Sequence, residues 1–304
     1  MLPFERVAII GMGLIGSSLA RAVRALMPTV RLTVHDADAD VRARVLALDL
    51  ADDVTDTAGA AVVDADLVVL CVPVRAMRAI AESFAADLSP GAVVSDVGSV
   101  KGQVLSDLGA VLPKGVALVP AHPVAGTEKS GPDAGFATRF ANRWCILTPG
   151  PDADAAAVAR VDAFWSRLGA NVEIMTPAHH DMVLAVTSHL PHLIAYSIVG
   201  TASDLEGVTS SEVIKYSAGG FRDFTRIAAS DPVMWRDVFL TNKDAVLDVL
   251  QRFSEDLTAL QRAIRWGDGE FLEALFTRTR AVRRTIIDAG QDTDADDFGR
   301  PHGS

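Results

Sequence analysis

The first 175 or so residues contain short, nearly continuous apolar runs separated by helical stretches. Apolar runs of this kind are typical of parallel strands covered on both faces. The helical stretches between them include Leu14–Leu26 and Ala153–Leu168. Their alternation predicts a doubly wound α/β domain over residues 1–176. The expected strands are Arg6–Ile10, Arg31–His35, Leu67–Val72, Val93–Asp96, Ala117–Pro120, Trp144–Thr148 and Val172–Met175.

The pattern changes after Thr176, which reads as a helix N-cap followed by Pro177 at the first helical position. No strand pattern follows, so residues 177–290 are predicted to form an all-helical domain. Residues 291–304 are acidic and then contain Gly, Pro and His, and we expect a flexible tail there. The expected helical segments are Pro177–Leu205, Ser210–Ser217, Pro232–Trp266 and Asp268–Ala289.

The segment Pro232–Trp266 has a long apolar face that one small domain does not easily cover. We therefore expect a homodimer formed through these helices, with a helix buried within one chain as the alternative. The apolar face comprises Val238, Phe239, Val246, Val249, Leu250, Phe253, Leu257 and Leu260.

Composition narrows the range of partners. The chain has 304 residues and a formal net charge of -11, which disfavours nucleic acids and anionic membranes. Cys71 and Cys145 are isolated and lack metal-ligand spacing, which fits a cytoplasmic protein. Val7–Ile10 follows the start too closely for a signal peptide, and no apolar run approaches the ~20 residues of a membrane span. We expect a soluble cytoplasmic protein with a small-molecule substrate.

A glycine-rich turn lies between the first strand and the first helix. Gly11, Gly13 and Gly16 form the G-x-G-x-x-G pattern, which binds dinucleotides in a Rossmann-type domain. The first glycine permits a tight turn, the second admits the pyrophosphate, and the third allows close helix packing. Asp36 ends the second strand 20 residues after Gly16, where an acid accepts hydrogen bonds from the ribose hydroxyls.

NAD is expected rather than NADP, because Asp38 and Asp40 follow Asp36 and no arginine stands beside it in the sequence. A 2′-phosphate would therefore meet negative charge. Lys101 is expected either to bind a phosphate or to cap a helix. The full set of expected cofactor contacts is Gly11, Gly13, Leu14, Ile15, Gly16, Asp36, Val72, Pro73, Ser99 and Lys101.

Five further motifs occur in order along the chain: Asp96–Lys101, His122–Gly131, Ser188–His192, Gly219–Arg226 and Asp231–Arg236. With the glycine turn, they closely resemble the prephenate/arogenate (cyclohexadienyl) dehydrogenase family of tyrosine biosynthesis, over about residues 5–288. The resemblance implies a nucleotide domain, a helical dimerisation domain, and an active site between them.

The resemblance also implies a reaction, an oxidative decarboxylation. Hydride passes from the ring carbon bearing the hydroxyl to NAD+, the ring carboxylate leaves as CO2, and the ring becomes aromatic. A neutral imidazole suits the hydroxyl proton because histidine titrates near neutrality. By similarity this base is His122, with a loop histidine of purely structural role as the alternative. Ser99 is expected to hydrogen-bond the same hydroxyl.

The substrate carries two carboxylates, so an acidic protein must supply local donors. Arg226 is expected to bind one of them, because a guanidinium holds a carboxylate with two hydrogen bonds. His189 and His192, three residues apart on a predicted helix, share a face and by similarity line the substrate pocket. The alternatives are a zinc pair, which lacks a third ligand, and a structural role for His189. No metal is expected.

Other residues are expected to contribute to the substrate site in smaller ways. Glu128 is expected to gate or bind the substrate, or else to be a solvated loop acid. Trp235 and Arg222 either line the pocket or only pack. Gly126 and Thr127 belong to the same loop as Glu128.

Two other functions are open to a protein with a dinucleotide-binding domain and a helical domain. A β-hydroxyacid dehydrogenase would place a catalytic lysine on the first long helix of its second domain, and Pro177–Leu205 contains no lysine. A non-catalytic NAD-binding redox sensor would not need His122, Ser99 and Arg226 together. The sequence leaves open the choice between prephenate and arogenate, which differ in a keto or an amino group.

Overall fold

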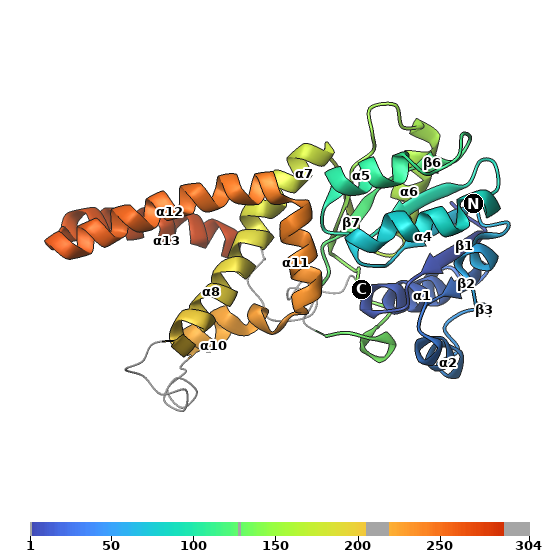
Figure 1. The fold of residues 1–304 in the computed structure, drawn as a ribbon, viewed down its shortest axis with the longest axis horizontal. Coiled ribbons are helices and arrows are strands. Elements are labelled where there is room, and N and C mark those ends of the chain that lie inside the picture. The colour runs from blue at the N-terminus through green and yellow to red at the C-terminus, as the bar shows by residue number, and fades with distance from the viewer. Residues whose placement is uncertain (1, 127–128, 205–218, 289–304) are drawn as a thin grey trace.

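The computed structural model describes residues 2–126, 129–204 and 219–288. A part built on β-sheets leads directly into a helical part, and the two lie side by side (Figure 1). In the helical part, α12 (Lys243–Trp266) and α13 (Gly269–Asp288) form an antiparallel pair that extends away from the sheets. Thr176, the residue predicted to begin the helical part, caps its first helix by accepting a hydrogen bond from the backbone N–H of His179.

The main sheet has six parallel strands in the order β3-β2-β1-β4-β5-β6. The order reverses between β1 and β4, which is the crevice where doubly wound proteins bind ligands. The sequence predicted four of these strands closely but missed β3, a three-residue edge strand, because it is too short to show a pattern. The strands are β1 (Arg6–Ile10), β2 (Arg31–His35), β3 (Asp53–Thr55), β4 (Leu67–Leu70), β5 (Val93–Asp96) and β6 (Ala117–Leu118).

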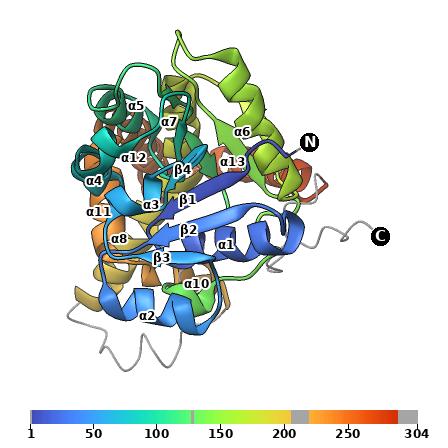
Figure 2. The same ribbon diagram turned by 90° about the vertical axis from the view of Figure 1, so that its right-hand side faces the viewer.

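Helices cover both faces of this sheet (Figure 2). In β1, Val7 and Ile9 face a core shared with α1 and α6, whereas Ala8 and Ile10 face a core shared with α3, α4 and α5. This alternation explains why the strand is apolar at four consecutive positions. The helices and turns of this part are α1 (Leu14–Leu26), α2 (Ala39–Ala47), α3 (Ala58–Val62), η1 (Val74–Ala76), α4 (Met77–Phe84), η2 (Ala85–Asp87), α5 (Lys101–Gly109), η3 (Pro132–Ala134) and α6 (Ala155–Arg167).

A second sheet of three strands, in the order β7-β8-β9, was not anticipated. The sequence predicted one strand ending at Pro120, whereas the chain leaves the main sheet after Leu118 and resumes as β7 (Ala121–Pro123). Pro120 cannot donate to a strand ladder, so it marks the crossing between sheets. β7 pairs antiparallel with β8 (Trp144–Leu147), which pairs parallel with β9 (Asn171–Ile174).

The predicted helix Pro177–Leu205 is a continuous helical run made of α7 (Pro177–Leu184), a π-helical segment η4 (Ala185–His189) and α8 (Leu190–Asp204). Pro191 lacks an N–H and its ring crowds the carbonyl one turn earlier, which accounts for the wider turn before it. By length and composition alone, Pro177–Asp204 is apolar enough to cross a membrane, with a mean hydropathy of 1.5. No segment of this kind was expected from the sequence, and 28% of its apolar window is buried in the single chain.

The predicted helix Pro232–Trp266 is divided in two at Asn242. Several large apolar side chains on α12 and α13 are exposed in the single chain, among them Leu257, Ile264, Trp266 and Phe276. The predicted helix Ser210–Ser217 and the predicted tail 291–304 lie outside the described residues. The remaining helices of this part are α10 (Gly219–Thr225), η5 (Arg226–Ala229) and α11 (Pro232–Thr241).

Candidate active site

The glycine turn between β1 and α1 has the geometry of a dinucleotide cradle. Gly11 has a φ of +97°, and a Cβ there would lie 2.5 Å from the carbonyl oxygen of Cys71. A Cβ on Gly16 would lie 1.9 Å from the carbonyl oxygen of Gly11. A Cβ on Gly13 would meet nothing within 4 Å, and no side chain caps α1. The turn therefore has no room for a Cβ at Gly11 or Gly16, where it packs, but it is open at Gly13, next to the N-terminus of α1. A helix N-terminus favours a bound anion.

Asp36 lies directly after β2, beside this turn. Its Oδ2 accepts a hydrogen bond from the backbone N–H of Met12 at 2.7 Å, and its Oδ1 accepts one from that of Asp38 at 2.9 Å. The carboxylate is thus fixed next to the glycine turn while it remains partly exposed. Val72 and Pro73 follow β4 at the same carboxyl edge of the sheet.

Lys101 does not lie where a phosphate could reach it. Its side chain is fully buried, and Nζ donates to Oδ2 of Asp96 at 2.5 Å and to the carbonyl oxygen of Ala121 at 2.7 Å. Asp96 also accepts hydrogen bonds from the backbone N–H groups of Gly98 and Ala121. The phosphate contact expected for Lys101 is therefore wrong in this geometry. The buried pair instead joins the loop containing Ser99 to the strand containing His122.

His122 lies within β7, rather than in a loop after a strand, and is 7% exposed. Its Nδ1 is 2.8 Å from Nε2 of His180, on α7. The Nδ1 of His180 is 2.8 Å from Oδ1 of Asp181. Asp181 in turn accepts hydrogen bonds from the backbone N–H groups of Lys101 and Gly102 at the start of α5. Three ionisable side chains therefore connect the helical part to the nucleotide-binding part.

The directions of these hydrogen bonds fix which ring nitrogen of His122 and of His180 carries the proton. A carboxylate only accepts, so His180 donates from Nδ1 to Asp181 and its Nε2 carries a lone pair. His122 then donates from Nδ1, which leaves its own Nε2 as an unprotonated base. Burial first, and then the neighbouring His180, hold the pKa of His122 well below its usual 6.5. His122 is thus neutral at pH 7, as a proton acceptor must be.

A second group of polar side chains gathers around Trp235 on α11. Its ring stacks on His192, with centroids 3.7 Å apart, and lies edge-to-face with His189 at 6.0 Å. The two histidines therefore do share a face, as predicted. The amide of Asn242 donates to the carbonyl oxygen of Asp181 at 2.8 Å and to Nδ1 of His189 at 3.1 Å. His189 consequently carries its proton on Nε2.

Two of these polar atoms are left for a ligand. Among the described residues, neither Nε2 of His189 nor Nε1 of Trp235 has a hydrogen-bond partner, and both side chains are buried. Burial mainly, together with the charges of His180 and His192, lowers the pKa of His189 to about 4. Both groups are therefore neutral hydrogen-bond donors, which suits the recognition of carboxylate or carbonyl oxygens.

Two of the remaining predicted substrate residues, Arg226 and Arg222, are exposed in the helical part. Arg226 begins η5, is exposed, and its positive charge contributes to lowering the pKa of His192, after burial as the main cause. Arg222 is exposed and pairs with its neighbour Asp223 at 3.1 Å. Gly126 is exposed at the end of the described chain after β7, and Thr127 and Glu128 lie outside the described residues.

Sequence reasoning missed His180, Asp181 and Asn242. No motif spacing joins residue 122 to residue 180, because their contact depends on how α7 docks on β7. One local signal was available: His179, His180 and Asp181 are three consecutive polar residues soon after the Thr176 cap, on a helix that is otherwise apolar.

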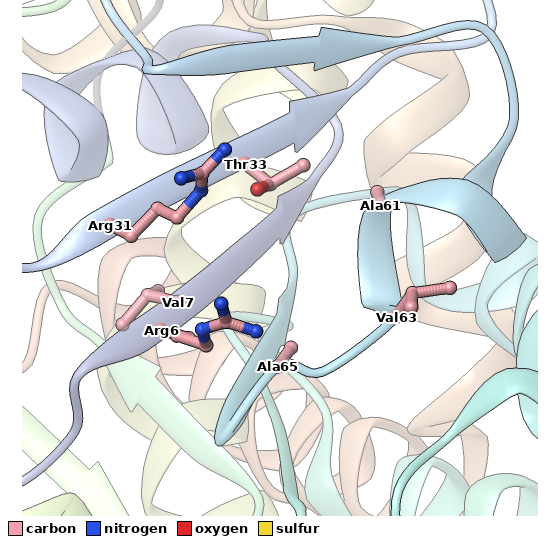
Figure 3. A pocket seen from close by; sticks show the side chains of 7 residues that line it. All are labelled: Arg6, Val7, Arg31, Thr33, Ala61, Val63 and Ala65. Carbon is pink, nitrogen blue, oxygen red and sulfur yellow. The ribbon is translucent and has the colours of Figure 1, made fainter.

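A small hollow at the other end of the main sheet is not part of this site (Figure 3). It lies at Arg6 and Arg31, the first residues of β1 and β2, whereas the glycine turn and Asp36 lie beyond the last. Both arginines are paired, Arg6 with Asp64 and Arg31 with Asp53.

Comparisons with known proteins agree with this geometry. The family model "Prephenate dehydrogenase, nucleotide-binding domain" matches residues 19–174, and "Prephenate dehydrogenase, dimerization domain" matches residues 176–278. The cyclohexadienyl dehydrogenase of Zymomonas mobilis is 46% identical over 286 residues, covering 94% of this chain and 97% of the relative.

Solved structures give the same result. A prephenate dehydrogenase from A. aeolicus, in complex with hydroxyphenyl propionate and NAD+, superposes with a TM-score of 0.85 at 36% identity, covering 93% of this chain and 98% of that one. The arogenate dehydrogenase of Synechocystis superposes with a TM-score of 0.78 at 26% identity, covering 92% and 99%.

Proposed function

The chain belongs to the prephenate dehydrogenase family, and from that membership we propose that it oxidises and decarboxylates prephenate, arogenate or both, with NAD+ as hydride acceptor. The products are 4-hydroxyphenylpyruvate from prephenate and tyrosine from arogenate. NAD fits the chain because Gly13 is open at the uncapped start of α1 and Asp36 lies beside it.

The observation that carries this proposal is the series of contacts from His122 through His180 to Asp181, from which we infer that Nε2 of His122 is unprotonated. We assign this atom as the base that takes the hydroxyl proton of the substrate. As hydride leaves the carbon bearing the hydroxyl, the C–O bond gains carbonyl character and its proton becomes acidic, so a positioned base lowers the barrier. His180 and Asp181 hold the imidazole in the required tautomer. Ser99, in the loop fixed by the Asp96–Lys101 pair, is assigned to the same hydroxyl.

The substrate carboxylates require donors, which the group around Trp235 supplies. We assign Nε2 of His189 and Nε1 of Trp235 as neutral donors, because both are buried and unpartnered among the described residues. Arg226 provides the cation for a carboxylate, close enough to His192 to affect its pKa. Gly126, Thr127, Glu128 and Arg222 complete the proposed substrate set from the sequence.

A homodimer in the cytoplasm forms part of the same proposal. The apolar side chains exposed along α12 and α13 need a cover, and a second copy presents the same face to them. The family model that matches this part is described as a dimerization domain.

The proposal is tested by following NADH absorbance with purified protein, NAD+ and either prephenate or arogenate. We expect NADH formation with at least one substrate, and the ratio of kcat/KM values gives the preference. A 3-hydroxy acid such as 3-hydroxyisobutyrate serves as the control for a β-hydroxyacid dehydrogenase. NAD+ binding without NADH formation from either cyclohexadienyl substrate would instead indicate a redox sensor.

A further inference from the structure

Residues 129–143, which lead into β8, return to the dinucleotide-binding helix first. Their short helix η3 packs beside α1 and α2 (Figure 2). Gly135 approaches α1 so closely that a Cβ there would lie 2.3 Å from Oγ of Ser17. Nε and Nη2 of Arg44, on α2, both donate to the carboxylate of Asp133. This segment is therefore fixed to the helix whose N-terminus forms the dinucleotide cradle.

Arg139 lies in this segment and is only 4% exposed. Its Nε donates to Oγ of Ser18 on α1 at 3.1 Å, and its Nη1 donates to the carbonyl oxygen of Ala125 at 2.8 Å. Its guanidinium lies 4.2 Å from the centroid of the Phe136 ring. The contact extends to the first turn of α1, because Oγ of Ser18 donates to the carbonyl oxygen of Leu14 at 2.7 Å.

The strand containing His122 is thus held by two buried cations. Nζ of Lys101 holds the carbonyl of Ala121, one residue before His122, and Nη1 of Arg139 holds that of Ala125, three residues after it. Burying a cation is costly unless its donors are satisfied, so both contacts are strongly directional. Lys101 fixes the strand to β5, whereas Arg139 fixes it to the dinucleotide-binding helix.

We propose that Arg139 is a positioning residue for the reaction, which sets the distance between the base on β7 and the dinucleotide bound at α1. This inference rests on the proposed role of His122. Hydride and proton leave one H–C–O–H unit of the substrate, so the nicotinamide and Nε2 of His122 must be held in register with each other. Arg139 makes this link through two hydrogen bonds that a single side chain supplies.

The test is Arg139→Gln, assayed for kcat, for KM and for NAD+ affinity by calorimetry. Misplacing reacting groups slows catalysis strongly, so we expect kcat per NAD+-binding site to fall about tenfold to a hundredfold. NAD+ affinity should stay within about threefold, since Arg139 touches the back of α1 rather than its open end. Arg139→Lys, which keeps the charge but reaches one acceptor, should lie between the wild type and Arg139→Gln.

The matched control is Arg21→Gln. Arg21 also joins α1 to this segment, donating to the carbonyl oxygen of Pro132 at 3.2 Å, but it does not contact Ala125. It should keep the wild-type kcat. Equal losses in the two variants would indicate a general packing role and overturn the proposal, as would an unchanged kcat in Arg139→Gln.

A second variant and a pH profile complete the test. If Arg139→Gln does not fold, Ser18→Ala decides in its place by the same drop in kcat per site. This variant removes the acceptor for Nε of Arg139, together with the hydrogen bonds that Oγ of Ser18 makes with Phe136 and Leu14, and leaves Arg139 itself in place. The pH at which the rate falls in acid should stay at the wild-type value in Arg139→Gln, because His180 and Asp181 are untouched. A wild-type protein inactive on both substrates would refute the proposed function itself, independently of Arg139.

Discussion

His122 and His180 meet across the junction of the two parts of the chain, with Nδ1 of one 2.8 Å from Nε2 of the other. The contact makes the proposed base depend on the docking of α7, because Asp181 both orients His180 and binds the backbone at the start of α5. The base is therefore in its reactive tautomer only when the two parts are packed together. Desolvation at this junction is also what keeps the imidazole neutral.

Cofactor selectivity should depend on Asp36. Asp36→Ser removes a ribose acceptor and a negative charge, so the ratio of kcat/KM for NAD+ to that for NADP+ should fall about tenfold or more. Asp38 and Asp40 remain and limit the gain with NADP+. Asp87→Ser is the control, because it changes the net charge by the same amount at a residue in η2, distant in sequence from Asp36. An unchanged ratio in Asp36→Ser would remove Asp36 from the ribose site.

The exposed apolar face of α12 and α13 should hold two copies together. Light scattering at micromolar concentration should give twice the chain mass of 32.2 kDa. Ile264 is 68% exposed in the single chain, and Ile264→Glu places a charge on this face, so it should shift the equilibrium toward the monomer. Val63→Glu, at an exposed position in the nucleotide-binding part, should leave it unchanged. A monomeric wild type would contradict the expectation.

Arg226→Ala should mainly raise KM for the cyclohexadienyl substrate. A lost charge-assisted hydrogen bond is worth about 1.5–3 kcal/mol, which corresponds to an increase of about 10- to 100-fold. NAD+ affinity should change little, because Arg226 lies in the helical part. Arg252→Ala, an exposed arginine on α12 paired with Asp256, is the control. If KM stayed at the wild-type value, the carboxylate anchor would have to be another residue.

Acid should destabilise the fold through His189. Its pKa is lowered from 6.5 to about 4 in the folded chain, so the unfolded chain binds the proton first as the pH falls. The stability is complete above pH 6.5 and is lost as the pH falls toward 4, by about 3 kcal/mol for a shift of this size. Urea unfolding across this range should therefore show a shallower loss for His189→Gln than for the wild type. His179→Gln, at an exposed histidine, should follow the wild-type curve.

The sequence predicted the features that depend on residues close together in the chain. The glycine turn, Asp36 at the end of β2 and the change to helices at Thr176 all depend on neighbours in sequence, and each was found. Lys101 was misread because burial of its ammonium depends on Asp96 and Ala121, whose positions come from the packing of two sheets. The contact of His122 with His180 could not be predicted for the same reason.

His122→Asn should abolish most of the catalysis while preserving NAD+ binding. Asparagine keeps a hydrogen-bonding group of similar size but cannot take a proton near neutrality, and general-base assistance is worth roughly 10²–10⁴-fold. We expect a fall in kcat within that range, a modest change in KM, and an unchanged NAD+ affinity. Because burial and His180 lower the pKa of His122, the wild-type kcat/KM should begin to fall only below pH 6.5 as the imidazole takes up its proton. The variant should lose this acid limb, whereas His179→Asn, beside His180 but exposed, should keep both the rate and the limb. A His122→Asn protein with near wild-type kcat and the same acid limb would transfer the role of base to His192, whose Nδ1 donates to the carbonyl oxygen of Ser188 and leaves Nε2 unprotonated.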